Sequence, residues 1–215
     1  MLLSRKRNLP ALNVQLDGSP IPQVTTHKHL GVVFNSRLFW ADHTTYIRNK
    51  AAKKIGLLRR LRQRLPPLVA RELYLTCIRP TLEYACEAWG GISASDSSSL
   101  EKSQRAAVRI ITRVSVKDGL PHDLLLARAG PETLASRRSV RIVSTVFKLA
   151  GATPKGPLNL REAFTNWLAM ASNSGSSMDL RSADKRGIRQ PRPRTELLRL
   201  SPFYRGVSVL NSIPP

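Results

Sequence analysis

The chain has 215 residues and carries 35 lysines and arginines against 14 aspartates and glutamates, a formal net charge of +21. This length suits one ordinary domain or two small ones, and the charge favours a polyanionic partner, with nucleic acid first and an anionic membrane surface second. Two cysteines exclude a disulfide framework. Because no secretory signal or membrane-spanning run is visible, we expect an intracellular location, the nucleus included, and no membrane partner.

Residues 1–39 have the pattern of short β-strands. Val14 and Leu16 alternate with polar neighbours before Asp17-Gly18, a pair that favours a tight turn. A second apolar run covers residues 30–34 and contains Gly31, which would let another backbone approach closely. We therefore predict a small N-terminal element of one hairpin or three strands.

From about Trp40 the apolar spacing becomes helical. Apolar residues recur on one helix face until Pro66-Pro67, at Ile47, Ala51, Ile55, Leu58, Leu61 and Leu65. A second helix starts at Pro67, is kinked or restarted at Pro80, and ends at Gly90-Gly91. These elements begin a helical bundle over residues 40–116.

The third helix of this bundle is predicted to begin at a capping box, Ser98-Ser99-Leu100-Glu101. Three helices in antiparallel order would bury one apolar seam. Residues 117–151 continue as additional helices, one of them ending at Gly130 and the next beginning at Pro131.

The remainder is predicted to be a basic tail. Residues 152–196 are expected to be a linker and a low-complexity basic segment without stable structure, and residues 197–215 regain apolar side chains and could dock back. The expected fold class is thus mainly α, with a small N-terminal β element, a helical bundle and a partly disordered basic tail.

A search for catalytic chemistry finds no convincing site. A two-metal polymerase or nuclease site needs clustered carboxylates, whereas the acids of this chain are scattered singly. A zinc site could in principle be assembled from His27, His29, Cys77 and Cys86, but their spacings match no compact finger and favour ordinary packing. We expect no catalytic residue, no metal site and no cofactor within this chain.

The strongest positive signal is basic. Residues 43–64 contain eight lysines and arginines and no acid, and five of these bases fall within an arc of roughly 120° on a helical wheel: Lys50, Lys53, Lys54, Arg60 and Arg64. Such a face suits a phosphate backbone, and its alternative interpretation is an ordinary solvated helix surface. Two further basic clusters follow, one at Arg105, Arg109 and Arg113 and the other at Arg137, Arg138 and Arg141.

Aromatic residues make up only 6% of the chain. Contact with the nucleic-acid backbone is therefore favoured over stacking on single-stranded bases. The aromatic residues Trp40, Tyr84 and Trp89 are predicted to be core anchors.

Four sequence motifs occur in an order that resembles one known family. They are Lys28-His29-Leu30-Gly31-Val32, Trp40-Ala41-Asp42-His43, the run from Ile78 to Cys86 with Trp89-Gly90, and Leu100-Glu101-Lys102 with Gln104-Arg105. Together they resemble the C-terminal part of reverse transcriptases (RNA-directed DNA polymerases) of LINE-type, non-LTR retrotransposons, over about residues 1–150. The ending around Leu210-Asn211-Ser212 is similar to the terminal motif of that family, with Leu210 in place of a tryptophan.

The resemblance implies separate roles for the hairpin and for the helices that follow it. Residues 28–34 would be the primer-grip hairpin and residues 40–114 the thumb, which closes on a template–primer duplex of RNA–DNA or DNA. The contact residues would be Lys28, Gly31, Lys50, Lys53, Lys54, Arg60, Arg64, Arg105 and Arg109. The fingers and palm, with the aspartates that hold magnesium, would lie upstream, so this fragment should bind without catalysing; the alternatives are a helical protein-interaction module or a decayed copy without nucleic-acid function.

Overall fold

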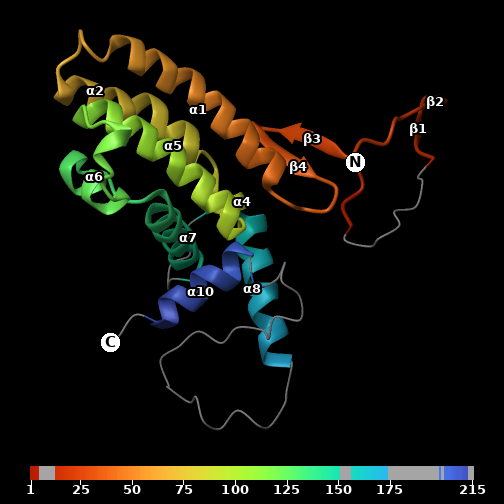
Figure 1. The fold of residues 1–215 in the computed structure, drawn as a ribbon. Helices are drawn as coiled ribbons and strands as arrows, with labels where there is room; N and C mark the ends of the chain where they lie inside the picture. The colour runs from red at the N-terminus through yellow and green to blue at the C-terminus, as the bar shows by residue number, and fades with distance from the viewer. Residues whose placement is uncertain (5–12, 151–155, 174–198, 200, 213–215) are drawn as a thin grey trace. The chain divides into compact units, whose positions relative to one another are not determined.

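The computed structural model describes residues 1–4, 13–150, 156–173, 199 and 201–212. The chain divides into two compact units, one formed by residues 1–85 and 92–134 and the other by residues 86–91 and 135–215. Helices dominate both units, and short antiparallel strands precede them (Figure 1). The predicted fold class, mainly α with a small N-terminal β element, is confirmed.

The strands form two separate hairpins and not one three-stranded element. The first pairs β1 (Gln15–Leu16) with β2 (Ser19–Pro20), and the second pairs β3 (Thr26–His29) with β4 (Val32–Asn35). The residues expected to open a strand, Leu30 and Gly31, form the turn of the second hairpin, with φ of 46° and 85°. A two-residue connection of this type needs positive φ at both positions, which explains why the apolar run is interrupted.

The first helix of the bundle follows the predicted periodicity as far as Leu61, four residues before the predicted last position, Leu65. Helix α1 spans Ala41–Leu61 and buries one face, made of His43, Thr44, Ile47, Ala51, Ile55 and Leu58. After Pro66 the chain reverses into α2 (Pro67–Leu73), a π-helical turn (Tyr74–Ile78) and α3 (Arg79–Glu83). The irregularity beside Pro80 agrees with the predicted restart, since proline has no N–H for the helical ladder.

Helix α5 (Ala94–Thr112) begins four residues before the predicted capping box. Its N-cap is Ser93, whose hydroxyl accepts the Asp96 N–H at 3.1 Å, so the expected cap at Ser98 is wrong. The side chain of Thr44 donates to Asp96 near the start of α1, and Arg62 donates to the Arg113 carbonyl near its end. Helices α1 and α5 therefore run in the same direction, with α2 and α3 returning between them, as an antiparallel three-helix order requires.

Helix α6 (His122–Ala129) completes the first unit after a short 3₁₀ turn (Val116–Asp118). It ends at Gly130, which has a φ of 79°, as predicted. Leu125, Leu126 and Ala129 pack against Val108 of α5 in one apolar cluster.

The second unit contains α4 (Cys86–Trp89), α7 (Leu134–Ala150), α8 (Leu158–Asn173) and α10 (Pro202–Ser212). Pro131 does not begin a helix, because α7 starts three residues later. Helix α8 lies within a range predicted to be linker, where its buried Phe164 and Trp167 supply the apolar contacts; they pack with Val146, Leu149 and Val207 of α7 and α10. The rest of the predicted linker and low-complexity segment after α8, residues 174–196, lies outside the described residues.

Candidate nucleic-acid interface

The hairpin β3–β4 is attached to the first turn of α1. The Val33 N–H donates to Nδ1 of His43 at 3.2 Å, and Nδ2 of Asn35 donates to Oδ2 of Asp42 at 2.8 Å. The rings of Phe34 and Trp40 meet edge to face with their centroids 5.6 Å apart. The edge of β4 is thus joined to α1 by both polar and aromatic contacts, which places the residues of β3 beside the helix.

This attachment brings Lys28 to the basic face of α1. Its Nζ donates to the Tyr46 hydroxyl at 2.7 Å, and Lys50 follows Tyr46 by one helical turn. The hydrogen bond from Lys28 is the main cause that lowers the pKa of Tyr46, helped by the positive charges of Lys28 and Lys50. Sequence reasoning missed Tyr46, although its position four residues before Lys50 was a usable signal.

Four bases make up what we call the cationic row: Lys28, Lys50, Lys53 and Arg60. All four side chains are exposed, and on a helical wheel the three bases from α1 lie within roughly 80° of one another. Within the described part of the chain, none of the four forms an ion pair with a carboxylate. Leu57, which is 56% exposed, lies in the same arc of α1. The row is therefore a solvated positive surface with one apolar side chain in it.

Two of the five predicted α1 bases do not belong to this row. Lys54 is half-buried, and its Nζ donates to the Cys77 carbonyl and to Oγ1 of Thr81, each at 2.7 Å. Its ammonium group thus links α1 to the π-helical turn and α3. Arg64 is exposed but lies beyond Leu61, in the turn that ends α1.

Gly31 approaches a side chain and not another backbone. A Cβ built on Gly31 would lie 3.2 Å from Cε1 of Tyr84, and the Tyr84 hydroxyl donates to the Leu30 carbonyl at 3.0 Å. Tyr84 is 54% exposed, so its predicted role as a core anchor is wrong. It supports the hairpin turn from the end of α3.

The other predicted basic residues lie on different elements. Arg105 and Arg109 are half-buried on α5, whereas the cationic row belongs to β3 and α1. Arg113 occupies the left-handed C-cap of α5 and reaches toward the Leu65 carbonyl. The third cluster is on α7 in the second unit, where Arg138 is buried and Arg141 lies 3.8 Å from Glu87. Among the predicted bases in the described residues, Lys28 of β3 is joined to the basic face of α1 through Tyr46.

The side chains considered for zinc show no ligand cluster. Cys77 is exposed and Cys86 is buried, while the rings of His27 and His29 stack with centroids 6.4 Å apart. Across the described residues, no three histidine, cysteine or acidic side chains gather in a way that could hold a metal ion.

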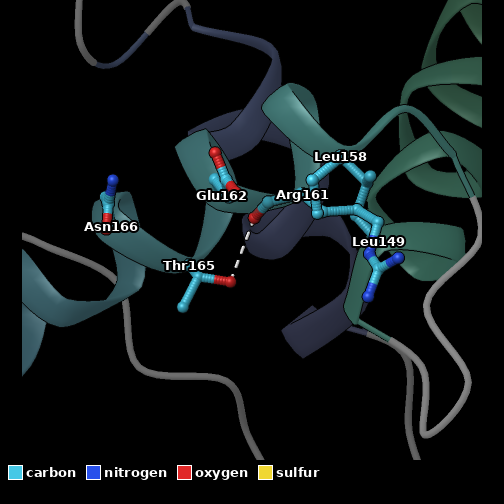
Figure 2. Close-up of a pocket in the computed structure, with 6 residues that line it drawn as sticks. All are labelled: Leu149, Leu158, Arg161, Glu162, Thr165 and Asn166. Atoms are coloured by element: carbon cyan, nitrogen blue, oxygen red, sulfur yellow. Dashed lines mark hydrogen bonds between the residues drawn. The ribbon is translucent and has the colours of Figure 1, made fainter.

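A depression of about 370 Å³ lies beside the junction of α7 and α8 (Figure 2). Apolar Leu149 and Leu158 line it together with Arg161, Glu162, Thr165 and Asn166. The Thr165 hydroxyl donates to the Arg161 carbonyl within the helix. This set contains no arrangement of nucleophile, base or metal ligands.

No helix in the described ranges has the length and apolar character that crossing a membrane requires.

Comparison with known proteins gives two relatives, both from Drosophila melanogaster. The chain is 29% identical over 110 residues to a protein named as the probable RNA-directed DNA polymerase from transposon X-element, and 26% identical over 102 residues to its counterpart from transposon BS. These alignments cover 50% and 46% of this chain but only 12% and 11% of the relatives. No protein-family profile and no solved structure matches the chain.

Proposed function

We propose that the chain is part of a retrotransposon RNA-directed DNA polymerase, in which hairpin β3–β4 acts as the primer grip and the bundle of α1, α2, α3 and α5 as the thumb. It would hold a template–primer duplex, RNA–DNA or DNA, against the cationic row. The similarity to two transposon polymerases supports the class of protein. The observation that carries the binding role is the meeting of Lys28 with the basic face of α1 through Tyr46.

The cationic row has dimensions that suit a nucleic-acid strand. From Lys50 to Arg60 a helix rises roughly 15 Å, which is about the axial length of four phosphates on one strand. The four side chains are exposed, so their ammonium and guanidinium groups can meet phosphates without first leaving a buried partner. Binding would then come from release of counterions and would track the backbone without reading the bases.

The chemical step would belong to other parts of such a polymerase. A two-metal mechanism requires carboxylates that hold magnesium, and the fingers and palm that carry them are the proposed partners of this chain. The aligned region covers about an eighth of the relatives. We therefore expect the isolated chain to bind duplex without extending a primer when magnesium and nucleotides are supplied.

The test is a duplex titration with charge-reversed variants. Lys50→Glu with Lys53→Glu removes two members of the cationic row, and the matched control, Lys102→Glu with Lys117→Glu, changes the same charge at exposed sites elsewhere in the first unit. For four phosphate contacts, the slope of log K against log salt should be roughly −2.8 to −3.6. The first variant should lose about half of that slope and the control much less; equal losses would remove the cationic row from the proposal.

One observation favours a second candidate, a helical protein-interaction module. Leu57 is 56% exposed among the bases of α1, and a protein partner that packed on this face would bury it. In that case Leu57→Ser would reduce self-association or partner binding measured by light scattering. The duplex affinity would then be weak and insensitive to salt, and Lys50→Glu with Lys53→Glu would not change it.

A further inference from the structure

Four residues at the junction of hairpin β3–β4 and α1 form a closed circuit of contacts, which we call the junction ring. Lys28 and Val33 face each other in the hairpin register, and the Val33 N–H donates to Nδ1 of His43 at 3.2 Å. The His43 ring stacks on Tyr46, with centroids 6.4 Å apart and planes at 29°. The Tyr46 hydroxyl accepts from Nζ of Lys28 at 2.7 Å and closes the circuit.

The hairpin register explains why the Val33 N–H is available. His29 and Val32 flank the two-residue turn and form the hydrogen-bonded closing pair, so the next pair, Lys28 with Val33, is a non-hydrogen-bonded pair. The Val33 N–H then points away from β3, along the outer edge of β4. His43 supplies the acceptor that this edge donor needs.

The same contact fixes which nitrogen of the His43 imidazole carries the proton. A ring nitrogen that accepts an N–H cannot carry a proton itself, so the proton of neutral His43 resides on Nε2. The His43 side chain is completely buried, which disfavours a charged ring. Of the three protonation forms of histidine, only the neutral ring with its proton on Nε2 can accept the Val33 N–H at Nδ1.

We propose that His43, as the neutral imidazole with its proton on Nε2, is the positioning residue that seats hairpin β3–β4 on α1 and thereby places Lys28 at the head of the cationic row. The hydrogen bond from Val33 to His43 fixes where β4 lies along α1. Because Lys28 pairs with Val33 in the hairpin, the position of Lys28 is fixed as well. Stacking on the His43 ring positions Tyr46, whose hydroxyl accepts the hydrogen bond from Lys28. The significance of Lys28 rests on the proposed function, whereas the junction ring does not.

Protonation of His43 should break the hydrogen bond from the Val33 N–H and free hairpin β3–β4 from α1. An imidazolium presents N–H groups from both ring nitrogens, so Nδ1 would oppose the Val33 N–H. Charged groups that contact or flank the junction include Lys28 of β3, Asp42 and Lys50 of α1, and Asp96 of α5; the two acids already accept from Asn35 and Thr44. Burial lowers the pKa of His43 to about 4, in keeping with a ring that stays neutral near pH 7.

The first test uses the unmodified chain labelled with ¹⁵N. A scalar coupling across the N–H···N bond between Val33 and His43, together with an Nε2-protonated tautomer in long-range ¹⁵N spectra, is expected at pH 7. An Nδ1-protonated ring, or a Val33 amide without the coupling, would overturn the proposal. This measurement does not depend on any variant folding or on nucleic acid.

The second test is a double-mutant cycle on duplex binding. Lys28→Ala and His43→Leu should each reduce the salt slope by about one phosphate contact, roughly 0.7 to 0.9, and their combination should lose no more than either alone. His43→Asn, whose Oδ1 can accept the Val33 N–H, should keep the original slope. Additive losses, or an unchanged slope in His43→Leu, would contradict the positioning role.

The two tests separate the possible failures. If the unmodified chain shows no salt-dependent duplex binding, the proposed function fails, and the NMR result still decides whether the junction ring exists. If His43→Leu does not fold, His43→Asn alone and combined with Lys28→Ala provides the comparison. A salt slope reduced by one phosphate contact in His43→Asn would then count against the proposal.

Discussion

Gly31 lies against the ring of Tyr84, so close that a Cβ on the glycine would be 3.2 Å from Cε1 of the tyrosine. The same tyrosine donates to the carbonyl of Leu30 at 3.0 Å. The turn of β3–β4 is thus held from α3 while its edge strand is held from α1. The hairpin has two independent supports, and each can be tested.

Gly31→Ala should destabilise the chain for two separable reasons. The φ of 85° is a left-handed value, which costs a residue with a Cβ about 1–2 kcal/mol, and the new methyl group would press on the Tyr84 ring. Urea titration should therefore show a larger loss for Gly31→Ala in the unmodified chain than in a Tyr84→Ser background, where only the φ cost remains. Equal losses in the two backgrounds would show that the close approach is unimportant.

Lys54 and Lys53 are adjacent in sequence, but replacement by methionine should destabilise the chain at Lys54 and have little effect on stability at Lys53. Lys54→Met removes two hydrogen bonds that join α1 to the π-helical turn and α3, and it should cost about 1–3 kcal/mol of the free energy of unfolding. Lys53→Met removes an exposed charge and should change stability by less than about 0.5 kcal/mol.

Duplex affinity should give the reverse order for these two variants. Lys53→Met is expected to lower affinity and reduce the salt slope by about one phosphate contact, while folded Lys54→Met retains the slope. A reduced slope in Lys54→Met with unchanged stability would mean that Lys54 contacts nucleic acid and does not serve the fold.

The stability of the chain should fall in mildly acidic solution because of His43. Its pKa is about 4 in the folded chain and near 6.5 in the unfolded one, so the unfolded state binds the proton first as the pH falls. The contribution is complete above about pH 6.5 and is lost as the pH drops toward 4. Between pH 7.5 and 5 this amounts to about 2 kcal/mol.

His43→Asn is the matched variant for the pH experiment, because asparagine accepts a hydrogen bond but does not titrate in this range. Urea midpoints measured from pH 7.5 to pH 5 should fall more steeply for the unmodified chain than for His43→Asn. Parallel curves would assign the acid sensitivity to other groups.

The N-terminus of α5 offers a comparison between two serines. Ser93→Ala removes the hydroxyl that accepts the Asp96 N–H at 3.1 Å and should cost about 1 kcal/mol. Ser98→Ala lies inside the helix, where alanine is a better helix former, and should be neutral or slightly stabilising. Thermal unfolding followed by circular dichroism measures both, and the opposite order would restore the cap predicted at Ser98.

The cap illustrates where sequence patterns stop being informative. Both Ser93 and Ser98 are followed three residues later by an acid, so both satisfy the local capping pattern. The choice between them depends on where α5 meets α1, since Asp96 also accepts from Thr44, which is 52 positions away in the chain. Similarly, Leu30-Gly31 fits a strand by composition and becomes a turn because β3 and β4 pair across it.

Local features, such as the periodicity of a helix and the residue that ends it, were predictable from the amino-acid sequence. The 3.6-residue spacing of apolar side chains predicted α1 with its buried face, and a glycine predicted the end of α6. Helix α1 ends at Leu61, before the prolines that were expected to stop it. The charge excess favours a polyanionic partner, which stays a prediction. These features depend on neighbours within a few residues, so they need no knowledge of the packing.

Only the tertiary structure decided which bases share one surface. Lys28 joins Tyr46 across 18 positions of sequence, and Lys54 turns to Thr81 across 27. Such contacts depend on the angle and register at which a hairpin and three helices pack. A helical wheel treats each helix alone, so it assigns Lys54 to the basic face and leaves Lys28 out.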